Sequence, residues 1–277
     1  MSPKMPNSRR NLDLAIERVF DDRETALRMR RVMANVIVGQ LLPDGVVKGG
    51  SAMKIRFGFA ATRVSSDLDT ARAKDIEAFV NELESALIDG WNGFTGHIVP
   101  LPPAKPKNVP PEYVMQPFDI KLSYNEKPWI TVPLEVGSDE IGDADEPEYF
   151  ISDDIVEIFR KLGFPDPKPV PLMPLHHQIA QKLHGASEEG SARAHDLVDL
   201  QVIVNHGEID WVKTRETCIR LFNYRRKQTW PPVVSKGEDW ESLYDAQRGN
   251  LDVETSVDGA IAWANDLIKK IDSMASK

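Results

Sequence analysis

The feature that most limits the possible fold is a change in hydrophobic periodicity about halfway along the chain. The segments "FDIKLSY" and "WITVPLEV" alternate apolar and polar residues, which is typical of strands with one buried face. From residue 152 onward, apolar residues recur at helical spacing. The sequence therefore predicts an α/β (α+β) protein with a small mixed sheet flanked by helices, followed by a helical C-terminal half. The expected domains are residues 1–150 and 151–277.

Weaker periodicities and turn residues place further elements around this sheet. Strands are expected at residues 66–70 and 94–101, and a short helix with Ser51 as its N-cap is expected after Gly50. The proline-rich segment 102–113 predicts a connection without regular structure. Helices are expected at residues 12–42, with a break near Asp21 and Asp22, and at residues 74–87, 153–162, 175–185, 192–205, 209–228 and 257–274.

Composition narrows the class of protein. The 277 residues carry a formal charge of −9, and the only cysteine is Cys218, so no internal disulfide framework is possible. The N-terminal segment lacks the apolar core of a secretory signal, and no run approaches the ~18 apolar residues of a membrane span. We therefore expect a cytoplasmic protein with no membrane partner. Any RNA must bind a local basic surface, for which residues 219–230 are the candidate; the alternative is an ordinary basic helix end.

A glycine pair followed by serine, "KGGSAM", lies at a predicted strand-to-helix turn. Glycine lets the backbone approach an anion, and the start of a helix offers N–H groups that have no partner within the helix. Gly49, Gly50 and Ser51 are therefore candidates for binding phosphate. The alternative is a common glycine turn with a serine cap.

Asp67 and Asp69 follow this turn and are separated by one residue. On a strand they would face the same way, ~6–7 Å apart along the backbone, where two carboxylates repel each other unless a cation lies between them. Magnesium prefers oxygen ligands and shares them with phosphates. A third carboxylate would complete a two-metal site, with Glu135 as first candidate and Asp119 as second. The alternative is an exposed strand end that caps the next helix; an EF-hand loop is excluded because it lacks the required glycine.

Two blocks together resemble the AbiEii-type nucleotidyltransferase-like toxins of type IV toxin–antitoxin systems. This family, which includes the MenT toxins, belongs to the DNA polymerase β nucleotidyltransferase superfamily. The first block is "KGGSAM" with "RVSSDLD", and the second is "LHHQIAQKLHGASEEGSARAHDLVDL". The chain differs from the family pattern in its long spacer, "FGFAAT", and in having His195 where an arginine is expected.

The resemblance implies specific roles for individual residues. Asp67, Asp69 and Glu135 would bind Mg²⁺, and Lys182 and Asp196 would complete the catalytic group, with Arg193 supporting Asp196. The residues expected to bind the nucleotide are Gly49, Gly50, Ser51, Arg63 and Ser66. Without the resemblance, Lys182 could equally be an exposed helix lysine whose stem covers apolar surface.

The implied activity is transfer of a nucleoside monophosphate from a nucleoside triphosphate to an acceptor, in a cleft between the two halves. The resemblance implies the 3′ end of tRNA as acceptor, with a block of translation, and a cognate antitoxin as partner. A protein hydroxyl and a non-catalytic nucleotide-binding module are the alternatives. The acidic run "DEIGDADEPE" is expected to be a solvated loop, and His176, His177 and His184 lack the spacing of a zinc site.

Overall fold

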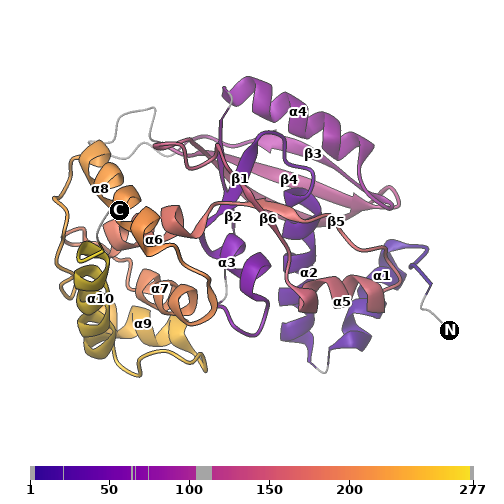
Figure 1. Cartoon of the computed structure of the whole chain (residues 1–277). Helices are drawn as coiled ribbons and strands as arrows, with labels where there is room; N and C mark the ends of the chain where they lie inside the picture. The colour runs from indigo at the N-terminus through magenta and orange to yellow at the C-terminus, as the bar shows by residue number, and fades with distance from the viewer. Residues whose placement is uncertain are drawn as a thin grey trace. The chain divides into compact units, whose positions relative to one another are not determined.

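The structure is a computed structural model of the whole chain, and it forms a mixed sheet with helices around it and after it (Figure 1). Its contacts divide the chain into two compact units. Unit 1 comprises Met1–Ala60 and Ser65–Met173, and unit 2 comprises Ala61–Val64 and Pro174–Lys277. The residues described are 4–20, 22–63, 65, 67–73, 75–103 and 114–274, and within them the chain has seven strands and ten helices. The predicted fold class is confirmed.

The sheet lies entirely in unit 1, and its strand order is β3-β4-β5-β2-β1-β7-β6. The β1/β7 and β2/β5 pairs are parallel, and the other neighbouring pairs are antiparallel. The sheet is therefore mixed, as predicted. The strands are β1 Gly45–Lys48, β2 Leu68–Arg72, β3 Phe94–Pro100, β4 Gln116–Tyr124, β5 Lys127–Ser138, β6 Glu148–Phe150 and β7 Val170–Leu172.

The sequence analysis missed the two strands at one end of the sheet, β6 and β7. Each has only three residues, which is too short for an alternating pattern to show. β7 pairs with β1 through Val47 and Leu172, and the Met173 amide donates to the Val47 carbonyl at 2.9 Å. Unit 1 therefore continues through Met173, past the point at which the sequence becomes helical.

The predicted break in the N-terminal helical segment is confirmed. α1 covers Arg9–Val19 and α2 covers Arg23–Gly39, and the Asp22 carboxylate caps α2 by accepting from the Thr25 amide at 2.8 Å. α2 contributes a nearly continuous buried run to the core and packs on β5 and β7. The cap at Asp22 starts a new helix and thus accounts for the break between α1 and α2.

The next two helices begin at different residues from those predicted. α3 covers Gly49–Phe57, so Ser51 lies inside the helix and is not its N-cap. Gly49 makes this early start possible, because its φ of +64° turns the chain directly from β1 into the helix. α4 covers Ile76–Asp89, and Asp75 caps it through the amides of Glu77 and Ala78. Several residues between these elements lie outside the described part of the chain: Asp21, Ser66, Lys74 and residues 104–113.

The sheet has one buried face and one open face along β4 and β5. The buried face carries Phe118, Ile120 and Leu122 from β4, and the alternation predicted for both strands is confirmed. These residues join the core with α1, α2, α4 and α5, the last of which covers Asp153–Lys161. Asp119 and Glu135 belong to the open face, where charged groups stay accessible.

Unit 2 is helical and is built around α6, Leu175–Ser187, which packs against α7, His195–His206, and α8, Trp211–Arg225. Two further helices, α9 at Trp240–Arg248 and α10 at Val257–Asp272, pack on α7. The sequence analysis did not predict α9. Because α6 lies inside the unit, its polar residues are buried as well: His176, His177, Gln178, Lys182 and His184.

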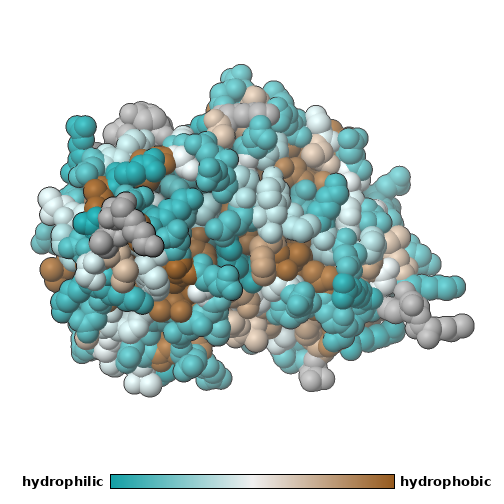
Figure 2. All heavy atoms as spheres, in the orientation of Figure 1, coloured by the Kyte–Doolittle hydropathy of each residue, from teal (hydrophilic) through white to brown (hydrophobic). Residues whose placement is uncertain are grey.

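No helix in the described part of the chain is both long enough and apolar enough to span a membrane. On the face displayed in Figure 2, apolar residues form small groups separated by hydrophilic side chains. This surface pattern is ordinary for a folded chain that buries its main core.

Candidate active site

A row of charged side chains crosses the open face of the sheet in unit 1. β2 pairs Asp69 with Lys48 of β1 on one side and with Glu135 of β5 on the other. Residues paired directly across neighbouring strands place their side chains on the same face. The structure thus brings together Asp69 and Glu135, which the sequence analysis selected, and adds Lys48, which it did not.

Gly49 lies directly against the Asp69 carboxylate. A Cβ at Gly49 would be 2.2 Å from Asp69 Oδ2, far inside van der Waals contact. The positive φ of Gly49 also disfavours any residue with a side chain. Glycine is therefore required here for two reasons, a backbone turn and the position of a carboxylate. Gly50 follows in the first turn of α3 and is buried.

The Ser51 hydroxyl connects α3 to the segment that carries Asp67. It donates to the Asp67 backbone carbonyl at 2.6 Å and accepts from Asn35 Nδ2 at 3.0 Å. Ser51 is buried, so in this structure its hydroxyl holds the start of α3 and the entry to β2 together. Its contact with a nucleotide stays a prediction.

The three carboxylates of Asp67, Asp69 and Glu135 act on one another. Partial burial, followed by the negative charges of Asp69 and Asp67, raises the pKa of Glu135, and Lys48 acts in the opposite direction. A hard divalent cation relieves this kind of repulsion, and carboxylate oxygens are the ligands that Mg²⁺ prefers. The donor set therefore fits such an ion by its chemistry. In the part of the chain described, no three acidic, histidine or cysteine side chains already surround a common ion position.

Asp119, the second candidate for a third carboxylate, lies on the same open face but has a cation of its own. It pairs with Pro133, two residues before Glu135 on β5. Lys121 Nζ lies 2.7 Å from Asp119 Oδ2 and 3.3 Å from Thr131 Oγ1. The charges that act on Glu135 are those of Asp69, Asp67 and Lys48. Asp119 is thus set apart from the carboxylate row by its ion pair.

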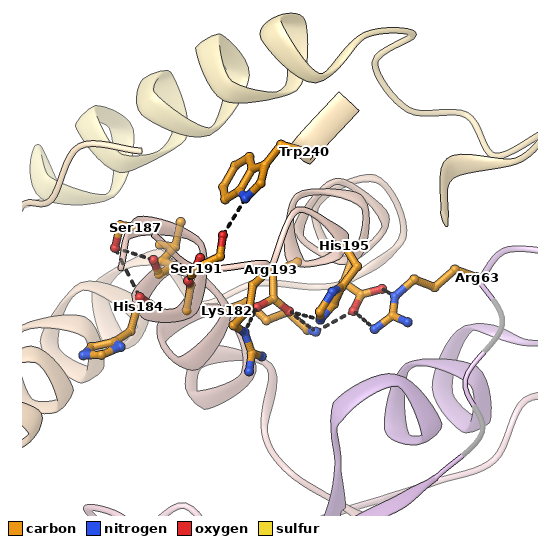
Figure 3. Close-up of polar contacts among 12 residues, drawn as sticks. Arg63, Lys182, His184, Ser187, Ser191, Arg193, His195 and Trp240 are labelled. Atoms are coloured by element: carbon orange, nitrogen blue, oxygen red, sulfur yellow. Dashed lines mark hydrogen bonds and ion pairs between the residues drawn. The ribbon is translucent and has the colours of Figure 1, made fainter. Parts of the chain in front are cut away.

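Unit 2 contains a second charged cluster, centred on Lys182 of α6 (Figure 3). Lys182 Nζ lies 3.1 Å from Asp196 Oδ1 and 2.6 Å from Asp199 Oδ2, both on α7. The side chains of the two aspartates are 0% and 2% exposed, and the Lys182 side chain is 6% exposed. The interpretation of Lys182 as an exposed surface lysine is therefore wrong.

Two arginines complete this cluster from outside α6 and α7. Arg63 donates to both oxygens of Asp199, from Nε at 2.9 Å and from Nη2 at 3.0 Å. Arg193 Nε donates to Asp196 Oδ2 at 2.6 Å. Figure 3 shows Arg63, Lys182, Arg193 and His195 converging on the same small region. Three cationic side chains thus surround two buried carboxylates.

The electrostatics of unit 2 differ from those of the carboxylate row. Burial alone would raise the pKa of Asp196, but Lys182 and Arg193 outweigh it and lower the pKa to about 2. For Asp199, burial is again outweighed, by Lys182 and Arg63, and the pKa is lowered. Burial lowers the pKa of His195, which favours its neutral form. The two aspartates are therefore firmly ionised and fully paired.

Glycine again makes close packing possible in this cluster. A Cβ at Gly185 would lie 2.4 Å from Arg193 Nε and 2.9 Å from Asp196 Oδ2. The absence of a side chain at Gly185 therefore lets the Arg193–Asp196 pair lie against α6. The support for Asp196 expected from Arg193 is present as an ion pair at 2.6 Å.

The roles predicted for Arg63 and Ser66 stay predictions, and two further charged residues join the clusters. Arg63, expected at the nucleotide, donates to Asp199 here, and Ser66 lies outside the described residues. Asp199 was not selected, although its position three residues after Asp196 puts both on one helix face. Lys48 was not selected either; its place directly before Gly49 was the available signal.

The acidic run after β5 is not entirely a solvated loop, and that expectation is wrong for Asp143. Asp143 is 0% exposed, and its carboxyl group accepts from the Glu140 amide at 3.0 Å. Asp139 accepts from the amides of Gly142 and Ala144 at 3.1 and 3.0 Å. Burial, together with a hydrogen bond to Asp139, raises the pKa of Asp143 to about 8. The loop therefore folds around a pair of carboxyl groups.

A mixed sheet with a glycine turn and a carboxylate row is the arrangement expected of a phosphoryl-transfer enzyme. The sequence model of the family described as "Nucleotidyl transferase AbiEii toxin, Type IV TA system" matches residues 31–265. The chain therefore belongs to this family, and it is a nucleotidyltransferase toxin of a type IV toxin–antitoxin system.

Two solved structures are similar to this chain, and the first of them agrees with its fold. The nucleotidyltransferase toxin MenT4 from Mycobacterium tuberculosis H37Rv superposes with a TM-score of 0.53 at 16% identity, over 96% of this chain and 98% of that chain. JHP933 from Helicobacter pylori gives a TM-score of 0.42 at 16% identity, over 90% of this chain and 92% of that chain. A search of curated protein sequences found no match.

Proposed function

We propose that this chain is a Mg²⁺-dependent enzyme that transfers a nucleoside monophosphate from a nucleoside triphosphate to an acceptor hydroxyl. The observation that carries the proposal is the carboxylate row. Asp69 and Glu135 are neighbours in the sheet, and the charges of Asp69 and Asp67 both act on Glu135. A bound divalent cation would relieve the repulsion between these like charges.

In the proposed reaction, an acceptor oxygen attacks the α-phosphorus of the donor. A new P–O bond forms, the bond from the α-phosphorus to the bridging oxygen breaks, and pyrophosphate leaves with the bonding electrons while the acceptor proton passes to water. Bound Mg²⁺ supplies positive charge to the phosphate oxygens. Asp67, Asp69 and Glu135 would hold the ion, and the backbone at Gly49 and Gly50 would face the phosphates.

Lys182 and Asp196 are proposed as the remaining catalytic residues. Their contacts within unit 2 support this role in one respect. The Lys182 ammonium is held by two carboxylates that are themselves oriented by Arg63 and Arg193. A buried charge fixed in this way needs little reorganisation during a reaction, which is the condition for electrostatic catalysis.

The proposed acceptor is the 3′ end of tRNA, where an added nucleotide prevents aminoacylation and so blocks translation. Support for this comes from membership in a toxin family. A cognate antitoxin is the partner that such a system requires. The proposal places the protein in the cytoplasm, where charged tRNA is used.

The test uses purified protein, Mg²⁺, each of the four α-labelled nucleoside triphosphates in turn, total bacterial tRNA and a bacterial protein extract. Wild type is compared with Asp69→Asn, and with Asp119→Asn as a matched control on the same face of the sheet. Label in tRNA that survives Asp119→Asn and disappears with Asp69→Asn supports the proposal. Label in protein alone shows a protein-modifying transferase. Binding of nucleotide without transfer to either acceptor contradicts the proposed activity and favours a regulatory module.

A further inference from the structure

Lys48 is a charged residue at the end of the carboxylate row to which neither the motif nor the proposed reaction gives a role. It is the last residue of β1, it pairs with Asp69 of β2, and it directly precedes Gly49 and Gly50. The side chain is half-buried. Its position therefore joins the carboxylates on one side to the start of α3 on the other.

Gly137 leaves room for the Lys48 ammonium. A Cβ at Gly137 would be 3.1 Å from Lys48 Nζ, closer than most side chains tolerate. Gly137 lies two residues after Glu135 on β5, so both positions belong to the same face of the sheet. The ammonium therefore lies over β5 beside Glu135, where its charge lowers the pKa of that residue against the larger effects of burial and of Asp69 and Asp67.

The ammonium is not committed to a partner among the residues described. Among the residues described, Lys48 Nζ has no ion pair or hydrogen bond. Asp143 is another acid on which the Lys48 charge acts, but Asp143 is completely buried and its pKa is raised to about 8, first by burial and then by Asp139. Asp143 is thus mostly a neutral acid at pH 7 and does not cancel the Lys48 charge.

A lysine whose purpose was to neutralise the carboxylates would contact them. This one lies beside them, and within the described part of the chain its N–H donors stay available. It is also adjacent in sequence to the glycines at the start of α3, where backbone N–H groups favour an anion. The neighbouring charges and the open donors both fit a phosphate group that arrives together with a cation.

We propose that Lys48 is a catalytic residue that binds the phosphates of the donor nucleotide and stabilises the departing pyrophosphate. This inference rests on the proposed nucleotidyl transfer. As the bond between the α-phosphorus and the bridging oxygen breaks, negative charge grows on the pyrophosphate oxygens. The Lys48 ammonium donates hydrogen bonds to them and keeps its own protons, so the balance of the reaction is unchanged.

The experiment uses full-length Lys48→Met and Lys48→Arg, with Lys121→Met as the matched control. Lys121 lies on the same open face but is paired with Asp119. Binding of Mg²⁺ alone, of Mg²⁺ with inorganic tripolyphosphate, and of Mg²⁺ with each nucleoside triphosphate is measured by calorimetry. Rates of transfer and thermal unfolding are measured on the same preparations.

For Lys48→Met we expect the Kd for tripolyphosphate and nucleotide to rise about 10- to 100-fold, which is the effect of losing a charged hydrogen bond. The Kd for Mg²⁺ alone is expected to stay the same or fall, because a repelling positive charge has been removed. Lys48→Arg should recover most of the phosphate affinity, and Lys121→Met should resemble wild type.

A phosphate-binding lysine and a structural lysine predict different results: only the first raises the Kd for phosphate when it is removed while the Kd for Mg²⁺ alone stays the same or falls. If Lys48→Met weakens Mg²⁺ and phosphate binding alike, or leaves phosphate binding and the transfer rate unchanged, the proposal is wrong. The binding measurements do not depend on transferase activity. If wild type binds tripolyphosphate through Lys48 but labels no acceptor, the proposed function fails and the phosphate-binding role of Lys48 remains.

Discussion

The carboxylates of the two charged clusters have pKa values shifted in opposite directions. In unit 1, Asp69 lies between Lys48 and Glu135 in the sheet, and burial and the negative charges of Asp69 and Asp67 raise the pKa of Glu135. In unit 2, two buried aspartates are surrounded by three cations at hydrogen-bond distance, and the aspartate pKa values are lowered. In the first cluster like charges act on one another, and in the second each aspartate is ion-paired with two cations.

This difference separates a site that is proposed to bind an external cation from one whose carboxylates are paired with cations of the folded chain. Burying a carboxylate is costly unless cations and hydrogen bonds compensate, and unit 2 provides both. The row in unit 1 is more accessible to water, so it bears less of that cost, but its like charges repel one another. Removing a charge should therefore have opposite consequences for folding in the two units.

Glu135→Gln is the strongest test of the unit 1 side of this comparison. We expect the rate of nucleotidyl transfer to fall by roughly 10²- to 10³-fold, because Glu135 is a proposed ligand of the metal ion. That ion would stabilise the transition state by several kcal/mol. The free energy of unfolding should stay the same or rise by a few tenths of a kcal/mol, since repulsion from Asp69 is removed. Single-turnover rates and urea unfolding measure the two quantities. A large loss of stability would show that Glu135 has a structural role.

The pH dependence gives Glu135→Gln a further signature. Because the folded pKa of Glu135 is raised, its contribution to stability is present at low pH and is lost as the pH rises through that value. The variant cannot titrate at this position. Its stability relative to wild type should therefore increase from about pH 4 upward, which unfolding curves at several pH values would show.

Lys182→Met tests the paired cluster of unit 2. It leaves Asp196 and Asp199 buried without the cation between them, and removing one partner of a buried ion pair costs about 3–5 kcal/mol. Thermal and urea unfolding measure this loss, and Lys269→Met, at an exposed pair on α10, serves as the control, with an expected change of less than about 1 kcal/mol.

Lowering the pH should reduce the difference in the free energy of unfolding between wild type and Lys182→Met. In wild type the pKa of Asp196 is about 2, so its stabilising contribution is present above about pH 4 and is lost as the pH falls through about 2. Without Lys182 the buried carboxylates bind protons at higher pH. If the difference in the free energy of unfolding between the two proteins stayed constant from pH 6 to pH 2, the charge network would not be the source of the stability.

Much of this comparison was accessible from the sequence, and the part that was not has a physical explanation. The strand around Glu135 alternates clearly, so its faces could be predicted from the sequence before its pairing was known. Pairing itself depends on strand order, which one sequence does not contain. That is why Lys48 was missed although it ends the same row.

The closed cluster was harder to predict because its members come from distant segments. Arg63 reaches Asp199 across 136 positions in the chain, and periodicity does not report such a contact. Likewise, Asp143 lies in a run so acidic that solvent exposure was the natural interpretation, yet the loop turns it inward to Asp139. Local patterns predicted the elements, and long-range contacts decided which charges are buried.

Asp143→Asn tests this buried acid with a smaller expected effect. Between about pH 4 and pH 8 the folded chain keeps a proton on Asp143 that the unfolded chain releases, so the stability of wild type falls as the pH rises in that window. The variant lacks this dependence. Its stability relative to wild type should increase by about 1 kcal/mol per pH unit between pH 5 and pH 7. Urea unfolding measures it, and the exposed Asp145→Asn should run parallel to wild type.

Asp119→Asn should have the smallest effect, and it defines the edge of the carboxylate row. The Asp119–Lys121 pair is partly exposed, so its loss should change the free energy of unfolding by less than about 1 kcal/mol. The transfer rate should stay within about twofold of wild type, because the charges acting on Glu135 are those of Asp69, Asp67 and Lys48. The rate is compared with that of Glu135→Gln under the same conditions. If Asp119→Asn inactivates the enzyme and Glu135→Gln does not, Asp119 is the third metal-binding carboxylate, and its pairing with Lys121 must break when the ion binds.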